Sequence, residues 1–141
     1  MQKIIPFVVV TLFLMGLTTA RADDTRQLVN LPEKMQQHMM SNMRDHLVTI
    51  NKILIYLGDN ELDKAAEIAE QRLGMSSLGD HGASHMSKFM PEGMRKAGTA
   101  MHKSASRFAL KAQEGDLLSS YKMLSEVTSA CTACHAGYKI R

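Results

Sequence analysis

Two cysteines and a histidine near the end of the chain carry the clearest chemical signal in the sequence. Cys131 and Cys134 are the only cysteines, and His135 follows directly, in the order Cys-Thr-Ala-Cys-His. This C-x-x-C-H pattern is the haem attachment motif, in which each thiol adds to one vinyl group of the porphyrin. On a helix, the two cysteines share a face and His135 lies one turn beyond Cys131. The sequence therefore predicts one covalent haem c, with His135 as the proximal iron ligand.

Other uses of a Cys-x-x-Cys pair agree less well with this sequence. A disulfide between Cys131 and Cys134 would close too short a loop to stabilise the fold much. A thioredoxin-like redox pair needs a βαβ setting, which the pattern of the chain lacks. A structural zinc site needs four ligands, and this pair supplies two.

The last residues of the chain also resemble those of a known family. The run Cys131-Thr-Ala-Cys-His-Ala-Gly-Tyr138-Lys139, and the entry Gly115-Asp116-Leu117 to the last helix, are similar to the class II cytochromes c, the cytochrome c prime family. The resemblance implies a haem held in a left-handed four-helix bundle, often in a homodimer, with His135 as proximal ligand. In this family the sixth iron position faces the first helix. Some members leave it open and bind NO or CO, whereas others place a methionine there and transfer electrons.

The expected first helix offers several candidates for the sixth ligand. Its methionines and histidines are Met35, Met39, Met40, Met43, His38 and His46. Met43 belongs to both of the apolar seams described below for this helix, so Met43 is the first choice and Met40 the second. His38 and His46 leave a bis-histidine iron open as an alternative, and an iron without a sixth protein ligand is another. Thioether sulfur would raise the potential relative to a second histidine.

Helical periodicity predicts the elements that must position these residues. We expect a first helix from Leu31-Pro32-Glu33 to Gly58, and a second that is capped at Asp59-Asn60 and stops at Gly74. Residues 75–90 read as a loop with a short helical turn. A third helix opens at Pro91, and Gly115-Asp116 separates it from a fourth that runs to Tyr138. With no strand pattern in the sequence, the predicted fold is all-α, an antiparallel up-down four-helix bundle with covalently bound haem.

The buried faces follow from the same spacing. On the first helix, one apolar seam is Met40, Met43, Leu47, Ile50, Leu54 and Leu57, and a second, overlapping seam is Met39, Met43, Ile50, Ile53 and Leu57. On the third helix, Met94, Met101 and Phe108 recur every seven residues. On the fourth, one face holds Leu117, Tyr121, Leu124, Thr128, Cys131, His135 and Tyr138.

The first 22 residues read as a secretory signal peptide. Lys3 precedes an apolar run from Ile4 to Leu17, and Ala20-Arg21-Ala22 places small residues where a signal peptidase cleaves. The run is shorter than the roughly 20 residues that cross a bilayer. We therefore expect a mature domain of residues 23–141, exported to the periplasm, with no membrane span after cleavage.

Composition and motifs exclude several other classes of function. The 141 residues carry a formal charge of +3, and Lys3 and Arg21 of the signal peptide account for most of it. Basic residues are dispersed, apart from a helical stripe at Arg95-Lys96, Lys103, Arg107 and Lys111, so no nucleic acid partner is expected. The chain has neither a phosphate-binding loop nor a nucleophile elbow. It is expected to be an electron carrier or haem-based ligand binder rather than an enzyme.

A methionine and histidine segment leaves one further hypothesis open. His81, His85, Met86 and Met90 combine imidazole with soft sulfur, a ligand set that suits copper.

The preferred interpretation of the whole chain is a periplasmic monohaem cytochrome c that exchanges single electrons with redox partner proteins. The alternatives are a five-coordinate cytochrome that binds NO or CO, and a periplasmic copper-handling protein.

Overall fold

The computed structural model describes residues 23–141, which are mostly helical with almost no strand, so the predicted all-α class is confirmed. The predicted signal peptide lies outside the described residues. The elements, in chain order, are β1 Gln27–Leu28, α2 Glu33–Gly58, α3 Leu62–Arg72, η1 Met75–Leu78, α4 Ala83–Met86, η2 Ser87–Phe89, α5 Glu92–Gln113, α6 Leu117–Gly137 and β2 Tyr138–Lys139. Within residues 23–141, no helix is both long and apolar enough to cross a membrane.

The predicted helix boundaries agree with the structure to within a few residues. Pro32 precedes α2 and Pro91 precedes α5, where a missing backbone N–H costs nothing. Asn60, in the turn after α2, has a φ of 58°. The predicted cap at Asp59-Asn60 is wrong in detail, because Glu61 precedes α3 and no side chain caps that helix. Residues 75–90 contain three short helical turns rather than one.

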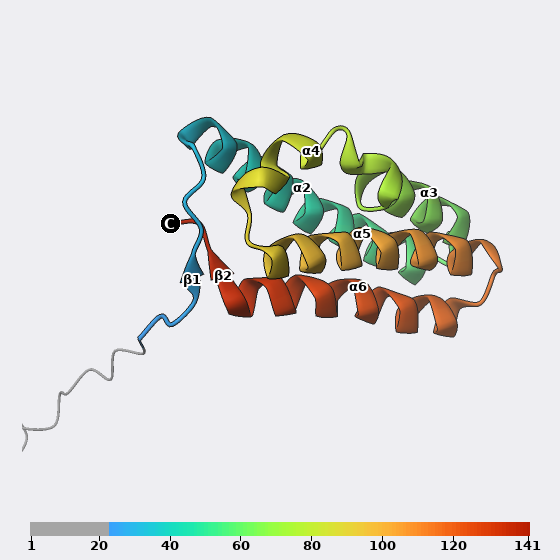
Figure 1. The fold of residues 1–141 in the computed structure, drawn as a ribbon. Helices are drawn as coiled ribbons and strands as arrows, with labels where there is room; N and C mark the ends of the chain where they lie inside the picture. Colours follow the sequence, from blue (N-terminus) through green and yellow to red (C-terminus); the bar gives the residue numbers. More distant parts are fainter. Residues whose placement is uncertain (1–22) are drawn as a thin grey trace, which may run out of the picture.

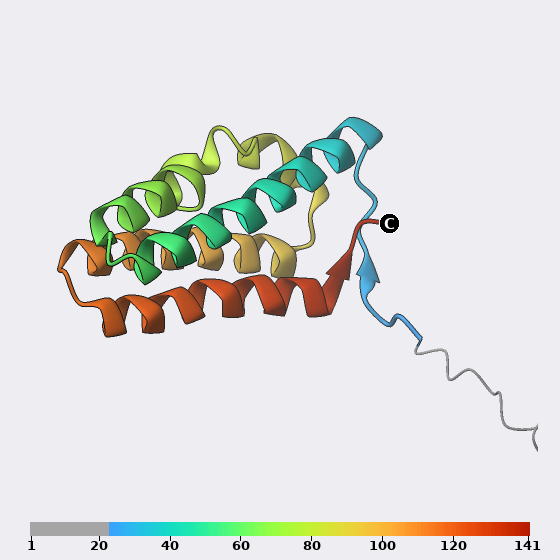
Figure 2. The same ribbon diagram turned by 180° about the vertical axis from the view of Figure 1, so that it is seen from behind.

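The long helices pack lengthwise around a main apolar core, and a second, smaller apolar cluster includes Val29, Met39 and Met86. α5 and α6 lie side by side and run in opposite directions, joined by a tight turn (Figures 1 and 2). Gly115 turns with a φ of +80°, and Asp116 accepts a hydrogen bond from the Ser119 N–H at 3.0 Å. α3 packs against both α2 and α5. The core side chains that are almost completely buried include Ile53, Leu57, Leu73, Phe108 and Val127.

One of the two seams predicted for the first helix is wrong. Leu47 is 71% exposed and Leu54 is 45% exposed, whereas Met39, Thr49, Ile53 and Leu57 are buried. The overlapping seam through Met39, Ile53 and Leu57 is the one that faces the core. The seam through Leu47 and Leu54 is displaced by one residue around the helix from the buried seam. Because α2 packs mainly on α3, the flank that carries Leu47 stays exposed to solvent.

The two ends of the described chain pair with each other. β1 and β2 are parallel, with Gln27 opposite Tyr138, and the Val29 N–H donates to the Lys139 carbonyl at 2.7 Å. Val29 and Leu31 are buried, so the stretch before α2 is fixed to the fold rather than loose. α6 also ends one residue earlier than predicted, at Gly137. This pairing closes the end of the molecule where the Cys-x-x-Cys-His motif lies.

Candidate functional site

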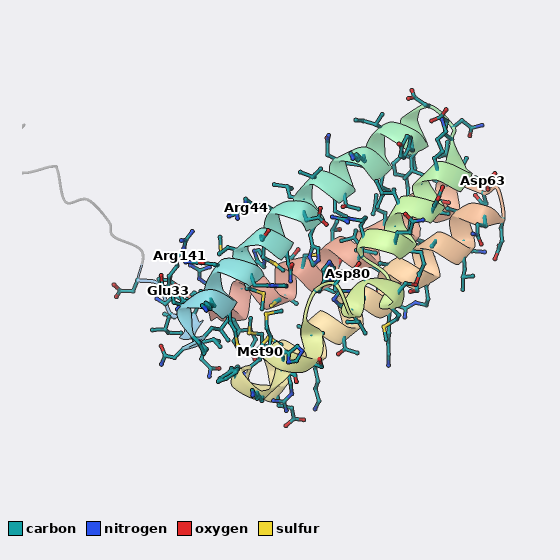
Figure 3. All side chains as sticks on the ribbon, turned by 90° about the horizontal axis from the view of Figure 1, so that it is seen from above. Glu33, Arg44, Asp63, Asp80, Met90 and Arg141 are labelled. Atoms are coloured by element: carbon teal, nitrogen blue, oxygen red, sulfur yellow. The ribbon has the colours of Figure 1, made fainter. Side chains whose placement is uncertain are left out.

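A methionine-lined cavity of about 400 Å³ lies between α2, α4, α5 and the C-terminal end of α6. Its wall includes seven methionines: Met39, Met40, Met43, Met86, Met90, Met94 and Met101. Figure 3 shows sulfur atoms gathered between α2 and the segment labelled at Met90. Volumes of this size, with mostly apolar walls and a few polar groups, are typical of cofactor and ligand sites.

The cysteine pair of α6 lies at the edge of this cavity. Cys131 and Cys134 are free thiols and half-buried, and burial raises the pKa of both. Cys134 lines the cavity, whereas Cys131, one turn earlier, packs against the main core. His135 also lines the cavity but is exposed. The motif thus spans the boundary between the apolar interior and solvent.

The predicted face of the last helix needs a correction. α6 buries Ser120, Leu124 and Val127, and the half-buried Cys131 and Cys134 continue that line. Tyr121, Thr128 and His135, which the sequence placed on the buried face, are exposed. The cause is that Ser120, although polar, is accommodated inside because its hydroxyl donates to the Asp116 carbonyl at 2.7 Å.

Both candidate sixth ligands, Met43 and Met40, line the same cavity as Cys134 and His135. Met43 also packs in an apolar cluster with Met39 and Cys134. Met39 is the most deeply buried methionine of α2, at 8% exposure. The structure therefore brings Cys134 and His135 of α6 and Met40 and Met43 of α2 to one cavity.

Four basic side chains line the cavity as well, namely Arg26, Arg95, Lys139 and Arg141. Asp24 holds two of them, because its carboxylate lies 2.8 Å from the Arg26 guanidinium and 3.2 Å from the Lys139 ammonium. The hydrogen bonds from Arg26 lower the pKa of Asp24 well below its usual range. Arg95 donates to the Met90 carbonyl at 2.7 Å. This arrangement concentrates positive charge at the cavity.

Three histidines from separate segments also meet at the cavity, an arrangement that the sequence did not predict. The ring centroids of His46 and His81 are 4.7 Å apart, those of His81 and His102 5.3 Å, and those of His46 and His102 6.0 Å. Burial, with the neighbouring imidazoles, lowers the pKa of His46 to about 4. Burial also lowers the pKa values of His81 and His102. All three are therefore neutral at neutral pH.

Hydrogen bonds determine which nitrogen carries the proton in two of these rings. His102 Nδ1 lies 2.7 Å from the Leu73 carbonyl, which can only accept. The Ser77 hydroxyl donates to the Gly74 carbonyl at 2.7 Å, so its oxygen accepts from His81 Nδ1 at 3.3 Å. Both rings therefore carry hydrogen on Nδ1 and a lone pair on Nε2. His46 Nε2 is buried, with no hydrogen-bond partner among the described residues.

The methionine and histidine segment of the sequence is divided by the fold. His81, Met86 and Met90 line the cavity, but His85 is exposed and is not part of the cavity wall. Among residues 23–141, no three His, Cys, Asp or Glu side chains form a group that could hold a metal ion by themselves. No local sequence spacing connects His46 and His102 to His81, because they lie far from it in the sequence.

Comparison of this chain with family models, with curated proteins and with solved structures finds no significant match.

Proposed function

We propose that this protein is a periplasmic monohaem cytochrome c of the class II type, an antiparallel up-down four-helix bundle that transfers single electrons. The observation that carries the proposal is that Cys134 and His135 of α6 share one cavity with Met43 and Met40 of α2. In this proposal Cys131 and Cys134 form the thioethers, His135 is the proximal ligand and Met43 the sixth ligand, with Met40 as second choice.

Several features of the cavity suit a haem. Its volume of about 400 Å³ and its methionine lining suit a large apolar ring. Gly98 of α5 lies in the wall, and a Cβ there would meet nothing within 4 Å, so the wall is open at this point. The basic side chains at the cavity, Arg26, Arg95, Lys139 and Arg141, can neutralise the carboxylates that such a ring carries.

The residues of the chain would supply attachment, ligation and environment. When bound, haem supplies the one-electron chemistry of its iron. The thiols of Cys131 and Cys134 fix the ring edge to α6, and the methionine-rich wall keeps water away. A soft sulfur ligand from Met43 favours the reduced iron and raises the potential. Because the reaction is electron exchange with redox partner proteins, no residue is assigned a catalytic role.

Two further parts of the proposal concern location and assembly. Export to the periplasm rests on the predicted signal peptide, and a homodimer rests on the family resemblance.

Three cations of the basic stripe on α5 are paired with carboxylates: Lys96 with Glu92 at 2.6 Å, Arg107 with Glu126 at 3.3 Å, and Lys111 with Glu114. Two of the cavity cations, Arg26 and Lys139, are likewise paired with Asp24, so Arg95 and Arg141 are the candidates for steering an acidic redox partner.

The optical spectrum of the reduced protein, with and without CO, tests the assignment of ligands. A sulfur ligand from Met43 predicts a sharp low-spin spectrum that CO does not change. Met43→Leu should then give a high-spin spectrum that shifts on adding CO, whereas Met40→Leu, one turn away, should keep the wild-type spectrum. The reverse pattern would transfer the ligand role to Met40.

The rival function is the binding of NO or CO at an open iron. It predicts that the wild-type spectrum is already high-spin and that CO shifts it. In that case neither methionine variant would change the spectrum, and the proposal of electron transfer through a methionine-ligated iron would be rejected.

A further inference from the structure

The histidine cluster has a feature that the proposed haem site does not use. His46 of α2 lies three residues after Met43, and His102 lies in the middle of α5, but neither is a haem ligand in the proposed function. His81 reaches the same point from the segment between η1 and α4. A polar atom such as His46 Nε2, buried without a partner, costs free energy unless something binds to it.

The surroundings of the cluster are those of metal-binding imidazoles. His102 donates its Nδ1 hydrogen to the Leu73 carbonyl, and His81 donates its own to Ser77. Histidines that bind metals usually make this kind of hydrogen bond with their other nitrogen, which orients the ring and leaves Nε2 free for the ion. Asn42 of α2 also donates to the His81 carbonyl at 3.0 Å, and so ties this segment to the helix that carries His46. The rings are thus held in place before any ligand arrives.

Soft sulfur lies in the same cavity wall. Met86 and Met101 are each 6% exposed, and both line the cavity with the three histidines. The imidazoles do not by themselves form a three-ligand metal group within residues 23–141, so a metal held here would also need the sulfur of a methionine. Imidazole together with thioether sulfur selects Cu(I) over zinc, magnesium or calcium.

We propose that His46 and His81, together with the sulfur of Met86 or Met101, form a Cu(I) site in the wall of the cavity. His46 and His81 are the closest ring pair, at 4.7 Å between centroids. His102, held by the Leu73 carbonyl, packs beside them as a positioning residue. The site differs from the copper site suggested by the sequence, because it excludes His85 and recruits His46 from α2.

The test is a titration of Cu(I), without oxygen, against a coloured Cu(I) chelator, using the full secreted protein that carries its haem. We expect one Cu(I) per chain, bound in preference to Zn²⁺. His46→Gln and His81→Gln should each weaken binding at least about tenfold, because loss of even an outer partner of a metal site has that effect. Met86→Leu and Met101→Leu identify the sulfur ligand, since only one of them should weaken binding to the same degree. His85→Gln, at an exposed histidine, is the matched control and should leave the affinity unchanged.

Absorption spectroscopy at the copper edge gives a second readout, in which nitrogen and sulfur should both appear among the nearest neighbours. Absence of stoichiometric Cu(I), tighter binding of Zn²⁺, or unchanged affinity in His46→Gln would overturn the site. Far-UV circular dichroism of each variant shows whether the helical fold is intact. Because none of the proposed copper ligands is a proposed haem ligand, copper content and haem content report separately on the two proposals.

Discussion

At the scale of single residues, His46 is the most unusual side chain of the described chain. Its Nε2 is buried without a partner, and two further imidazoles lie within 6.0 Å of its ring. A proton on any one of the three rings would repel a proton on the others. The burial that depresses the pKa of His46 therefore couples the stability of the fold to pH.

The free energy of unfolding of the metal-free protein should fall as the pH is lowered from 6.5 to about 4. In this window an unfolded His46 binds a proton and the folded one does not, because its pKa falls from 6.5 to about 4 on folding. Protons therefore favour the unfolded chain, and His46 alone should account for a loss of about 1–2 kcal/mol by pH 5. Above pH 6.5, His46 is neutral in both the folded and the unfolded chain, so it no longer contributes to the pH dependence of stability.

Urea unfolding with a chelator present, compared at neutral pH and at about pH 5, measures this effect. In His46→Gln, the free energy of unfolding should fall less between neutral pH and pH 5 than in the wild type. The reduction should equal the contribution of the missing imidazole. His85→Gln is the matched control, because that histidine is exposed. An equal loss of stability in His46→Gln and in the wild type would contradict the account.

At the scale of elements, Gly93 of α5 lies directly against the side chain of Tyr138 in β2. A Cβ on Gly93, in the first turn of α5, would collide with the Tyr138 hydroxyl. Tyr138 in turn pairs with Gln27, so α5 is linked through β2 to β1. Glycine at this position therefore permits a close approach of the Tyr138 side chain, rather than an unusual backbone angle.

Gly93→Ala should destabilise the protein, although alanine within a helix ordinarily stabilises it by about 0.5–1 kcal/mol over glycine. The reason is the steric clash with the Tyr138 hydroxyl. In a Tyr138→Phe background, where that hydroxyl is absent, the same substitution should be neutral or stabilising. A double-mutant cycle of unfolding free energies measures the coupling between the two positions, and a coupling near zero would show that the contact is unimportant.

The boundaries of the helices were predictable from the sequence, but their buried faces were predictable only in part. Pro32, Gly58, Pro91 and Gly115 act locally through their backbone preferences, and each marks a helix end in the structure. Which flank of α2 is buried depends on its neighbours, and α2 packs mainly on α3. In the sequence, Leu47 and Leu54 match a helical seam as well as Met39 and Ile53 do, yet both leucines are exposed.

At the scale of the whole molecule, the fold brings together residues that the sequence separates widely. The sequence motif identified Cys131, Cys134 and His135, and periodicity identified Met40 and Met43. All of them except Cys131, which packs against the main core, line one cavity. The meeting of His46, His81 and His102 was not predictable, because each comes from a different segment and no local spacing connects them. The pairing of β1 with β2 was equally hidden, since two-residue strands have no detectable alternation.

The central claim is that haem is attached covalently to Cys131 and Cys134. The most direct test is the intact mass of the protein secreted by a host with working cytochrome assembly machinery. We predict a coloured protein whose mass is that of residues 23–141 plus one haem, retained after denaturation. The double variant Cys131→Ala, Cys134→Ala should lose the added mass. A colourless wild-type product with the mass of the bare polypeptide would contradict the claim.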